Sequence, residues 1–321
     1  MKAAVVEELG KPPVVRDFDE PRRGEGQALI EVTAAPLNPV DVWIASGRYY
    51  AGAPPVPYVA GREAVGRVRE ADGLDAGTRV YAGGGSGGMA ERLVAPEDEL
   101  VELPEGVEDA LASCFGIAGL AAWLALDWRG RVQAGETVLV LGASGAVGAI
   151  AVQGAKLLGA TRVVAAARSE EGLERARQLG ADATVRIAEQ SREELAEAFV
   201  DAAGGQIDLT IDPLWGEPAA AAVHATGHGG RLVHVGQSAG PEASFSSNDV
   251  RGRLISILGH TNYAAPLEAR RDAYLTMLRH AAAGELTVAH ERLPLDRASE
   301  AWERQQASPG RKLVLVPSGV P

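Results

Sequence analysis

Residues 137–159, TVLVLGASGAVGAIAVQGAKLLG, constrain the fold more than any other segment of the chain. The apolar run Thr137–Leu141 is typical of a buried parallel strand. Gly142, Gly145 and Gly148 follow at once, and apolar residues then recur at helical spacing. The order strand, glycine turn, helix leaves backbone N–H groups at a helix N-terminus, where the helix dipole favours an anion such as a pyrophosphate.

The spacing of the glycines is G-x-x-G-x-x-G, because Ala143 stands where the first glycine of the standard G-x-G-x-x-G pattern would be. A side chain at Gly145 would block the approach of a pyrophosphate, and one at Gly148 would push the helix away from the strand. The alternative is a glycine-rich connector in another kind of α/β protein. Because the flanking strand and helix are both recognisable, we predict a dinucleotide site.

Beyond the glycine turn, strand-like and helix-like segments alternate as far as residue 259. The predicted strands are 137–141, 162–166, 183–187, 207–211, 231–235 and 254–258. The predicted helices are 146–158, 170–179, 191–203 and 217–225, and Ser191 and Glu194 form a capping box for the third. Six strands with helical crossovers predict an α/β fold with a doubly wound, six-stranded parallel Rossmann sheet.

The first hundred residues follow a different pattern, with short apolar runs between Pro- and Gly-rich turns. The predicted strands there are Ala3–Val6, Ala28–Thr33, Glu63–Arg69, Arg79–Tyr81 and Glu91–Ala95. After the parallel sheet, helices are predicted near 266–283 and at 295–306, before a final strand at Lys312–Val316.

We expect the C-terminal tail to pack back on a mostly β first domain. The predicted division is 1–115 with 285–321 for that domain and 116–284 for the dinucleotide-binding domain. The active site is then expected in the cleft between the domains, beyond the C-terminal ends of the parallel strands.

Charge and cysteine content exclude several classes of partner and site. The 321 residues carry 31 Lys and Arg against 43 Asp and Glu, a net charge of −12 with no basic stripe, so nucleic acid and anionic membranes are not expected partners. No uninterrupted apolar run reaches the roughly 18 residues of a membrane helix, and the N-terminus lacks the apolar core of a signal peptide. Cys114 is the only cysteine, which excludes an intramolecular disulfide and favours a cytoplasmic location.

Several motifs taken together resemble those of one enzyme family. They are the opening KAAVVEELG, APLNPVDVWIASGRY (35–49), PYVAGREAVGRV (57–68), GGMAERLVAP (87–96), the glycine turn, LGADATV (179–185) and RKLVLVP (311–317). The chain resembles the medium-chain dehydrogenase/reductase superfamily, and within it the zinc-free quinone oxidoreductase branch that includes zeta-crystallin. The resemblance implies a GroES-like catalytic domain, a Rossmann domain and NADPH-dependent reduction of quinones or conjugated carbonyls.

Three positions differ from the zinc-dependent members of that superfamily. Asn38 stands where they have a cysteine ligand, Arg62 where they have a histidine ligand, and Val40 where a hydroxyl residue starts their proton relay. Cys114 falls near their third ligand, but one soft ligand does not make a tetrahedral zinc site, and a cationic Arg62 would repel the metal. We therefore predict that the protein holds no metal and does not oxidise alcohols.

The predicted catalytic residues are Asn38, Tyr49 and Arg62, the first two suggested by the resemblance. Asn38 is expected to face the nicotinamide and the substrate, and its alternative role is a turn asparagine bonded to its own backbone. Tyr49 either donates a hydrogen bond to the substrate carbonyl or packs at the domain edge. Arg62 either stabilises a developing enolate or quinol oxygen or forms a salt bridge with Glu63 or Asp41.

The end of the second Rossmann strand, where NAD enzymes have an acidic residue, holds Ala167 followed by Arg168. An arginine fits a 2′-phosphate, so we predict NADPH as the cofactor. The alternative is a surface arginine, with Ser169 serving only as a helix cap. The predicted cofactor-binding residues are Gly142, Ser144, Gly145, Ala146, Val147, Gly148, Arg168, Ser169, Val235, Gly236 and Lys312.

The leading hypothesis is an NADPH-dependent reductase that transfers hydride to quinones or α,β-unsaturated carbonyls without zinc. An enoyl-thioester reductase and a non-catalytic NADPH-binding protein with a structural or regulatory role are the alternatives. The segment LISILG (254–259) is typical of an exposed apolar edge strand, which pairing with a second copy would cover. A homodimer is therefore expected.

Overall fold

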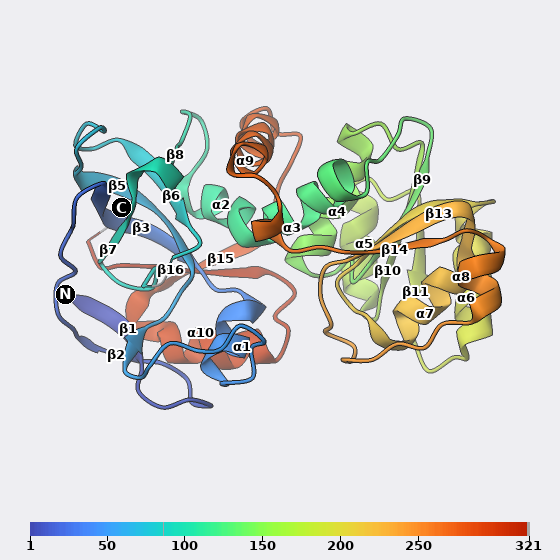
Figure 1. Ribbon diagram of the computed structural model, residues 1–321, viewed down its shortest axis with the longest axis horizontal. Helices are drawn as coiled ribbons and strands as arrows, with labels where there is room; N and C mark the ends of the chain where they lie inside the picture. Colours follow the sequence, from blue (N-terminus) through green and yellow to red (C-terminus); the bar gives the residue numbers. More distant parts are fainter. Residues whose placement is uncertain (86, 320–321) are drawn as a thin grey trace. The chain divides into compact units, whose positions relative to one another are not determined.

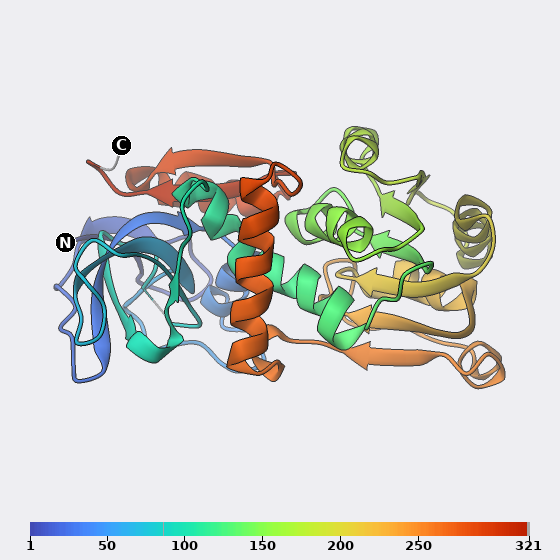
Figure 2. The same ribbon diagram turned by 90° about the horizontal axis from the view of Figure 1, so that it is seen from above.

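The computed structural model describes residues 1–85 and 87–319, and the chain forms two compact units (Figure 1). The first unit comprises Met1–Ile117 and Tyr274–Pro321, and the second comprises Ala118–Ala273. Both passages of the chain between the units lie in helical segments. The first is in the helical run Asp109–Arg129, and the second is in α9 (Leu267–Ala282), the long orange helix of Figure 2.

The first unit is mostly β. Its strands are β1 (Lys2–Val6), β2 (Val14–Asp17), β3 (Gln27–Pro36), β4 (Tyr58–Val59), β5 (Glu63–Glu70), β6 (Arg79–Gly83), β7 (Arg92–Pro96), β8 (Val101–Glu102), β15 (His290–Pro294) and β16 (Lys312–Val316). Its short helices are α1 (Pro39–Ala45), η1 (Glu97–Glu99), α2 (Asp109–Cys114), η5 (Leu295–Arg297) and α10 (Ala298–Gln306), and the π-helical turn η2 (Phe115–Gly119) begins in it.

Two sheets enclose the core of this unit. One has the order β15-β16-β3-β5-β6-β8, with β7 paired to β3, and the other has the order β2-β1-β4. The tail strand β16 pairs antiparallel with β3, with Val314 opposite Pro36, so the C-terminal segment is part of this unit. The core contains Ile30, Val32 and Leu313 from this sheet, and Trp302 of α10 packs among them.

The second unit contains a six-stranded parallel sheet. Its strands are β9 (Thr137–Leu141), β10 (Arg162–Ala167), β11 (Ala183–Arg186), β12 (Ile207–Asp212), β13 (Thr226–His234) and β14 (Ser256–Gly259). Its helices are α3 (Leu120–Leu124), η3 (Ala125–Arg129), α4 (Ala146–Leu157), α5 (Glu170–Gln178), α6 (Arg192–Ala203), α7 (Gly216–Ala225), α8 (Ser247–Gly252), η4 (Asn262–Ala264) and the first half of α9.

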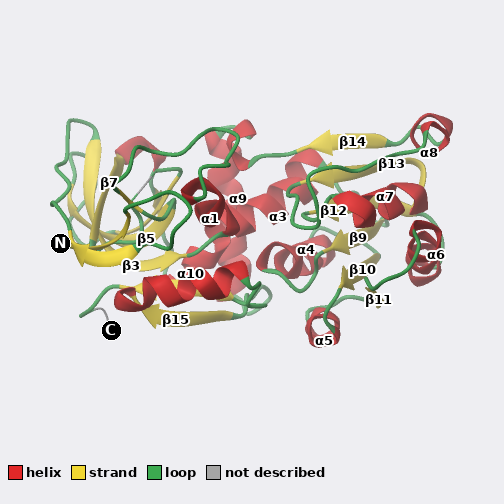
Figure 3. Cartoon of the chain, turned by 90° about the horizontal axis from the view of Figure 1, so that it is seen from below, coloured by secondary structure: helices red, strands yellow, loops and turns green. Residues whose placement is uncertain are grey.

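The strand order of the parallel sheet is β11-β10-β9-β12-β13-β14. The chain moves outward from β9 to β11 and then returns to the other side of β9, which makes the β9/β12 boundary the topological switch point. Because such crossovers are right-handed, α4 and α5 cover one face while α6 and α7 cover the other, and Figure 3 shows these helices around the strands. Leu139, Val164 and Leu232 of the sheet pack with Phe199 of α6 in one core cluster.

The predicted doubly wound sheet is confirmed. The observed strand limits differ most from the predicted ones at β13 and β14, on one side of the sheet. β13 begins at Thr226 rather than at 231, because Thr226 pairs with Ile207 before an irregularity in the register. β14 begins at Ser256 rather than at 254. Leu254 has a φ of 56°, and the N–H of Ile255 donates to Val250 O at 3.0 Å, which closes the end of α8.

The helical run Asp109–Arg129 is long and apolar enough to cross a membrane by length and composition alone. However, 83% of its most apolar window is buried inside the protein. This burial is what the core helix of a globular protein requires, since its apolar side chains then pack against protein rather than lipid. The run bends at Gly116, whose ψ of −112° is not helical.

Candidate functional site

The glycine turn lies at the carboxyl end of β9, the central strand beside the switch point. Gly142 has a φ of 62°, in the left-handed region that favours glycine, and Gly145 is the N-cap of the twelve-residue helix α4. The N–H groups of Ala146, Val147 and Gly148 begin this helix, so they have no acceptor within it. A ligand anion could therefore accept hydrogen bonds from them.

The three glycines have different surroundings. A Cβ on Gly148 would lie 2.4 Å from Gly142 O, so this glycine lets α4 approach the turn, as predicted. A Cβ on Gly145 would meet only Gly142 O, at 3.5 Å, so the protein leaves the approach to this residue open. A Cβ on Gly142 would lie 3.1 Å from Leu214, in the loop after β12. The turn thus fits a pyrophosphate and is bordered by the β12 loop.

Arg168 and Ser169 follow β10, the strand next to β9. The exposed Arg168 side chain makes no hydrogen bond or ion pair with any residue that the structure describes. Ser169 Oγ accepts from the N–H of Gly172 at 3.2 Å and caps α5, so the capping role considered for it is present. A Cβ on Gly172 would lie 2.4 Å from Ser144 Cβ, which places the start of α5 directly against the glycine turn.

The ends of β12 and β13 complete the carboxyl edge of the sheet. The N–H groups of Val235 and Gly236 donate to Asp212 O at 2.7 and 3.3 Å. The buried Asp212 carboxylate accepts from the N–H groups of Leu214 and Trp215 at 2.9 and 2.8 Å. These bonds join the end of β13 to β12 and fix the start of the β12 loop, whose Leu214 lies beside Gly142 of the turn. The predicted segments of this unit thus come together at one edge.

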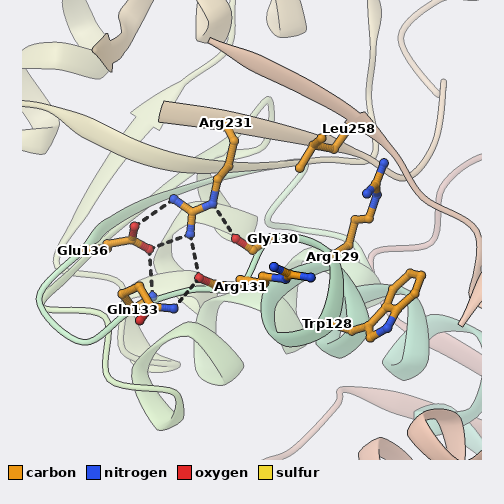
Figure 4. Close-up of a pocket in the computed structure, with 8 residues that line it drawn as sticks. All are labelled: Trp128, Arg129, Gly130, Arg131, Gln133, Glu136, Arg231 and Leu258. Atoms are coloured by element: carbon orange, nitrogen blue, oxygen red, sulfur yellow. Dashed lines mark hydrogen bonds and ion pairs between the residues drawn. The ribbon is translucent and has the colours of Figure 1, made fainter. Parts of the chain in front are cut away.

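A pocket of about 480 Å³ lies at the opposite, amino end of these strands (Figure 4). Glu136, directly before β9, binds Arg231 of β13 through two bonds of 2.8 and 2.7 Å. Arg231 also donates to the carbonyls of Gly130, Asp208 and Arg131, so its N–H groups are all engaged. Arg231 therefore joins these segments structurally, and this pocket is separate from the glycine turn.

In the first unit, Asn38 belongs to a buried polar cluster, defined here as Asn38, Asp41, Glu63, Tyr81 and Lys312. Asn38 Nδ2 donates to Glu63 Oε1 at 2.8 Å and, over a longer 3.4 Å, to Pro36 O. Lys312 Nζ donates to Asn38 Oδ1. Asn38, Glu63 and Lys312 are 1%, 2% and 3% exposed, so solvent does not compete for these bonds.

The Glu63 carboxylate connects this cluster to the chain passages between the units. Its Oε2 atom accepts from the Tyr81 hydroxyl at 2.8 Å and from the N–H of Ile117 at 2.6 Å. Ile117 is the last residue before the chain enters the second unit, and Tyr274, stacked on Tyr81 at 4.5 Å, is the first after it returns. Burial raises the pKa of Glu63, while Lys312 and these hydrogen bonds act in the opposite direction.

Asp41 contributes a second buried carboxyl to the cluster. Its Oδ2 accepts from the N–H of Asn38 at 2.8 Å, while Oδ1 has no hydrogen-bond partner among the described residues. Burial raises the pKa of Asp41 to about 7, and Glu63 adds to the increase. Asp41, Tyr58 and Arg62 line a small pocket of about 20 Å³, enough for one water molecule.

Arg62 and Tyr49, the other two predicted catalytic residues, are more exposed than Asn38. Arg62 is half-buried at this small pocket, and its Nη2 donates to Gly84 O at 3.1 Å. Tyr49 is half-buried in the segment after α1, with its ring 4.5 Å from that of Tyr50. Lys312, predicted to bind cofactor, lies in the first unit with its ammonium group at Asn38.

Asn38 and Cys114 stand at or near positions where the zinc-dependent members of the superfamily have zinc ligands. Asn38 offers an amide already bonded to Glu63 and Lys312. Burial raises the pKa of the Cys114 thiol to about 12, and Cys114 Sγ donates to Ala110 O. Across residues 1–85 and 87–319, no three His, Cys, Asp or Glu side chains gather as metal ligands. The donor set present in the first unit therefore does not fit zinc.

Sequence reasoning missed the roles of Glu63, Tyr81 and Gly172. Glu63 was considered as a partner of Arg62, but it binds Asn38, Tyr81 and Ile117. The only signal was weak: Glu63 directly precedes the apolar residues at the start of β5, and residues 63–66 are all buried. A buried acid of this kind requires donors from elsewhere in the chain, which spacing alone does not reveal.

Comparison with known proteins matches both units to one family. Residues 24–105 match the model of the alcohol dehydrogenase GroES-like domain, and residues 146–282 match the model of the zinc-binding dehydrogenases. The human quinone oxidoreductase is 31% identical over 312 residues, which cover 94% of this chain and 93% of the human protein.

Solved structures agree with these matches over nearly the whole chain. The quinone oxidoreductase from Thermus thermophilus, described together with its complex with NADPH, is 31% identical with a TM-score of 0.83. The match covers 98% of this chain and all of that one. A mycobacterial quinone oxidoreductase is 25% identical with a TM-score of 0.89 and covers 99% of this chain and all of its own.

The raised pKa of Asp41 predicts a specific dependence of stability on pH. In the unfolded chain this carboxyl titrates near 3.8, and in the folded protein it titrates near 7. Protonation of Asp41 therefore stabilises the folded protein fully below about pH 4, and this stabilisation is lost as the pH rises to 7. Asp41→Asn removes this titration, so the variant should gain stability relative to the wild type between pH 4 and 7, with no further gain above 7.

Urea unfolding of both proteins at half-unit pH intervals measures this difference. A difference in unfolding free energy that stays constant from pH 4 to 8 would contradict the assignment of the raised pKa to Asp41.

Proposed function

Because the chain belongs to the quinone oxidoreductase branch of the medium-chain dehydrogenase/reductase superfamily, we propose that it uses NADPH to reduce quinones or α,β-unsaturated carbonyls without zinc. An NAD(P)H-dependent oxidoreductase is the general activity that its relatives support. The observation that favours NADPH is the open glycine turn beside the exposed Arg168, whose side chain has no partner among the described residues.

The glycine turn supplies the binding chemistry for the cofactor. The N–H groups at the start of α4 would hold the pyrophosphate, and Ser144 and Gly145 would border it. Arg168 would bind the 2′-phosphate by charge-assisted hydrogen bonds, with Ser169 next to it. Val235 and Gly236, at the end of β13, would contact the cofactor on the other side of the switch point.

When bound, NADPH supplies a hydride to a quinone or to the β-carbon of a conjugated carbonyl. One proton must follow, and the negative charge that develops on the substrate oxygen needs a hydrogen-bond donor. Arg62 carries a permanent positive charge at a small pocket, and Tyr49 carries a hydroxyl nearby in sequence. One N–H of the Asn38 side-chain amide donates to Glu63 at 2.8 Å. The other donates to Pro36 O over a longer 3.4 Å, and a ligand oxygen could take the place of Pro36 O as its acceptor.

Two further proposals concern the assembly and the location of the protein. β14 forms one edge of the parallel sheet, and we propose that it pairs with β14 of a second copy in a homodimer. We also propose a cytoplasmic location, since the chain has one buried cysteine, which suits a reducing compartment.

A substrate panel tests the proposed reaction. We expect NADPH oxidation with simple quinones or enones, at a rate that dialysis against a chelator leaves unchanged. Faster turnover of enoyl thioesters would favour the alternative thioester reductase. Binding of NADPH without oxidation in the presence of any acceptor would favour a structural or regulatory role, and activity that only zinc restores would refute the metal-free mechanism.

Arg168→Ala tests the choice of cofactor. Loss of one charge-assisted phosphate pair costs about 1.5–3 kcal/mol, or roughly one to two decades in the Kd of NADPH. The Kd of NADH should hardly change. Arg251→Ala on α8, another exposed arginine, is the matched control and should change neither value. Equal weakening of both cofactors in Arg168→Ala would mean that Arg168 does not bind the 2′-phosphate.

Tyr49→Phe and Arg62→Met test the source of the hydrogen bond to the substrate oxygen. Simple enones develop more localised charge than quinones, so removal of the donor should slow enone reduction more. We expect Tyr49→Phe to lower kcat for enones by roughly 10²-fold with little change in the Kd of NADPH. If both substrates react normally, Tyr49 only lines the pocket, and the same comparison on Arg62→Met decides whether Arg62 is the donor.

Ile257→Pro tests the dimer. The N–H of His260 donates to His234 O in β13, so alternation along the strand directs the N–H of Ile257 away from β13. Proline at 257 removes that outward donor and should shift the molecular mass in light scattering towards the monomer, whereas Ile257→Ala should not. A monomeric wild type at micromolar concentration would contradict the proposed dimer.

A further inference from the structure

The Asn38 amide lies between two groups with opposite hydrogen-bonding capacity. An ionised carboxylate only accepts hydrogen bonds, and an ammonium group only donates them. Glu63 faces Asn38 Nδ2, and Lys312 faces Asn38 Oδ1. Rotation of the amide by half a turn would place Nδ2 against the ammonium and Oδ1 against the carboxylate, so both contacts would become repulsive.

From this arrangement we propose that Glu63 and Lys312 are positioning residues that hold the Asn38 amide in a single orientation required for turnover. The role in turnover rests on the reductase function proposed above, whereas the control of orientation does not. The orientation directs the remaining Nδ2 hydrogen towards Pro36 O, where its 3.4 Å bond is the weakest that the amide makes.

Burial makes this control effective. All three side chains are at most 3% exposed, so water does not offer the amide alternative partners. Glu63 is itself held by two further donors, Tyr81 and the N–H of Ile117, on its other oxygen. A Cβ on Gly116 would lie 1.9 Å from Glu63 Oε2, which shows how closely the backbone encloses this carboxylate.

The donors around Glu63 identify an informative double variant. In Glu63→Gln, one amide oxygen can still accept from Tyr81 and Ile117, but the amide nitrogen then faces Asn38 and can only donate. Asn38 satisfies that donor only if its own amide rotates to present Oδ1. Lys312→Met removes the ammonium that opposes this rotation and also removes the unbalanced buried charge.

We expect the double variant Glu63→Gln/Lys312→Met to retain its fold with the Asn38 amide reversed. Neutron diffraction distinguishes the deuterated nitrogen from the oxygen and reads the orientation directly. The single variants Glu63→Gln and Lys312→Met each remove one of the two charges that face Asn38 and leave the other buried. Both should melt at lower temperature than the double variant. The kcat of the double variant should fall by at least tenfold.

A second variant separates positioning from general loss of stability. Asp109→Asn weakens the Arg79–Asp109 ion pair in the same unit, whose side chains make no hydrogen bond with Asn38, Glu63 or Lys312. It should lower the melting temperature while kcat stays near the wild-type value. An unrotated Asn38 amide in the double variant would overturn the control of orientation. A rotated amide with wild-type kcat would overturn its role in turnover. A wild type that reduces no acceptor would refute the proposed function, and the diffraction result would still decide the orientation.

Discussion

The first unit depends on one buried carboxylate, that of Glu63. A buried ion is costly unless every part of it is paired, and Glu63 meets this requirement with donors from three separate segments and a nearby ammonium. Those segments are the turn before α1, strand β6 and the end of α2 with the π turn after it. The carboxylate therefore imposes one arrangement on parts of the chain that are far apart in sequence.

The second unit relies on backbone geometry rather than on a charge. Its glycine turn brings α4 close to β9, and the loop after β12 closes on the turn from the other side of the switch point. The result is an edge where the N–H groups at the start of α4 have no acceptor within the helix. The exposure of backbone N–H groups at this edge is thus a property of the sheet topology, whereas the buried polar cluster of the first unit is a property of particular side chains.

The parallel sheet could be predicted from the sequence because each of its elements carries its own local signal. Thr137–Leu141, the glycines after it and the capping box of Ser191 all act within a few residues. The short strands β2, β4 and β8 were not predicted, because they are two to four residues long and form only when neighbouring strands provide partners.

The candidate site was predicted in part for the same reason. The positions of Gly148 and Arg168 just after parallel strands could be read from local sequence, whereas a role of Arg168 in binding stays a prediction. The bonds of Asn38 could not, because its partners are 25 and 274 residues away in sequence. No periodic pattern in the sequence relates residues so far apart. Only the tertiary fold brings the Glu63 carboxylate and the Lys312 ammonium to opposite ends of the Asn38 amide.

The two passages between the units also bear on how such a chain can be divided. The N–H of Ile117 is bonded to Glu63, Glu63 is bonded to Tyr81, and Tyr81 stacks on Tyr274. Residues 118–273 therefore leave and rejoin the first unit at nearly the same place, as an inserted domain does. An insertion whose ends meet can be removed and its host closed with a short linker. The second unit is thus an insertion whose two points of attachment are connected, within the first unit, through Glu63 and Tyr81.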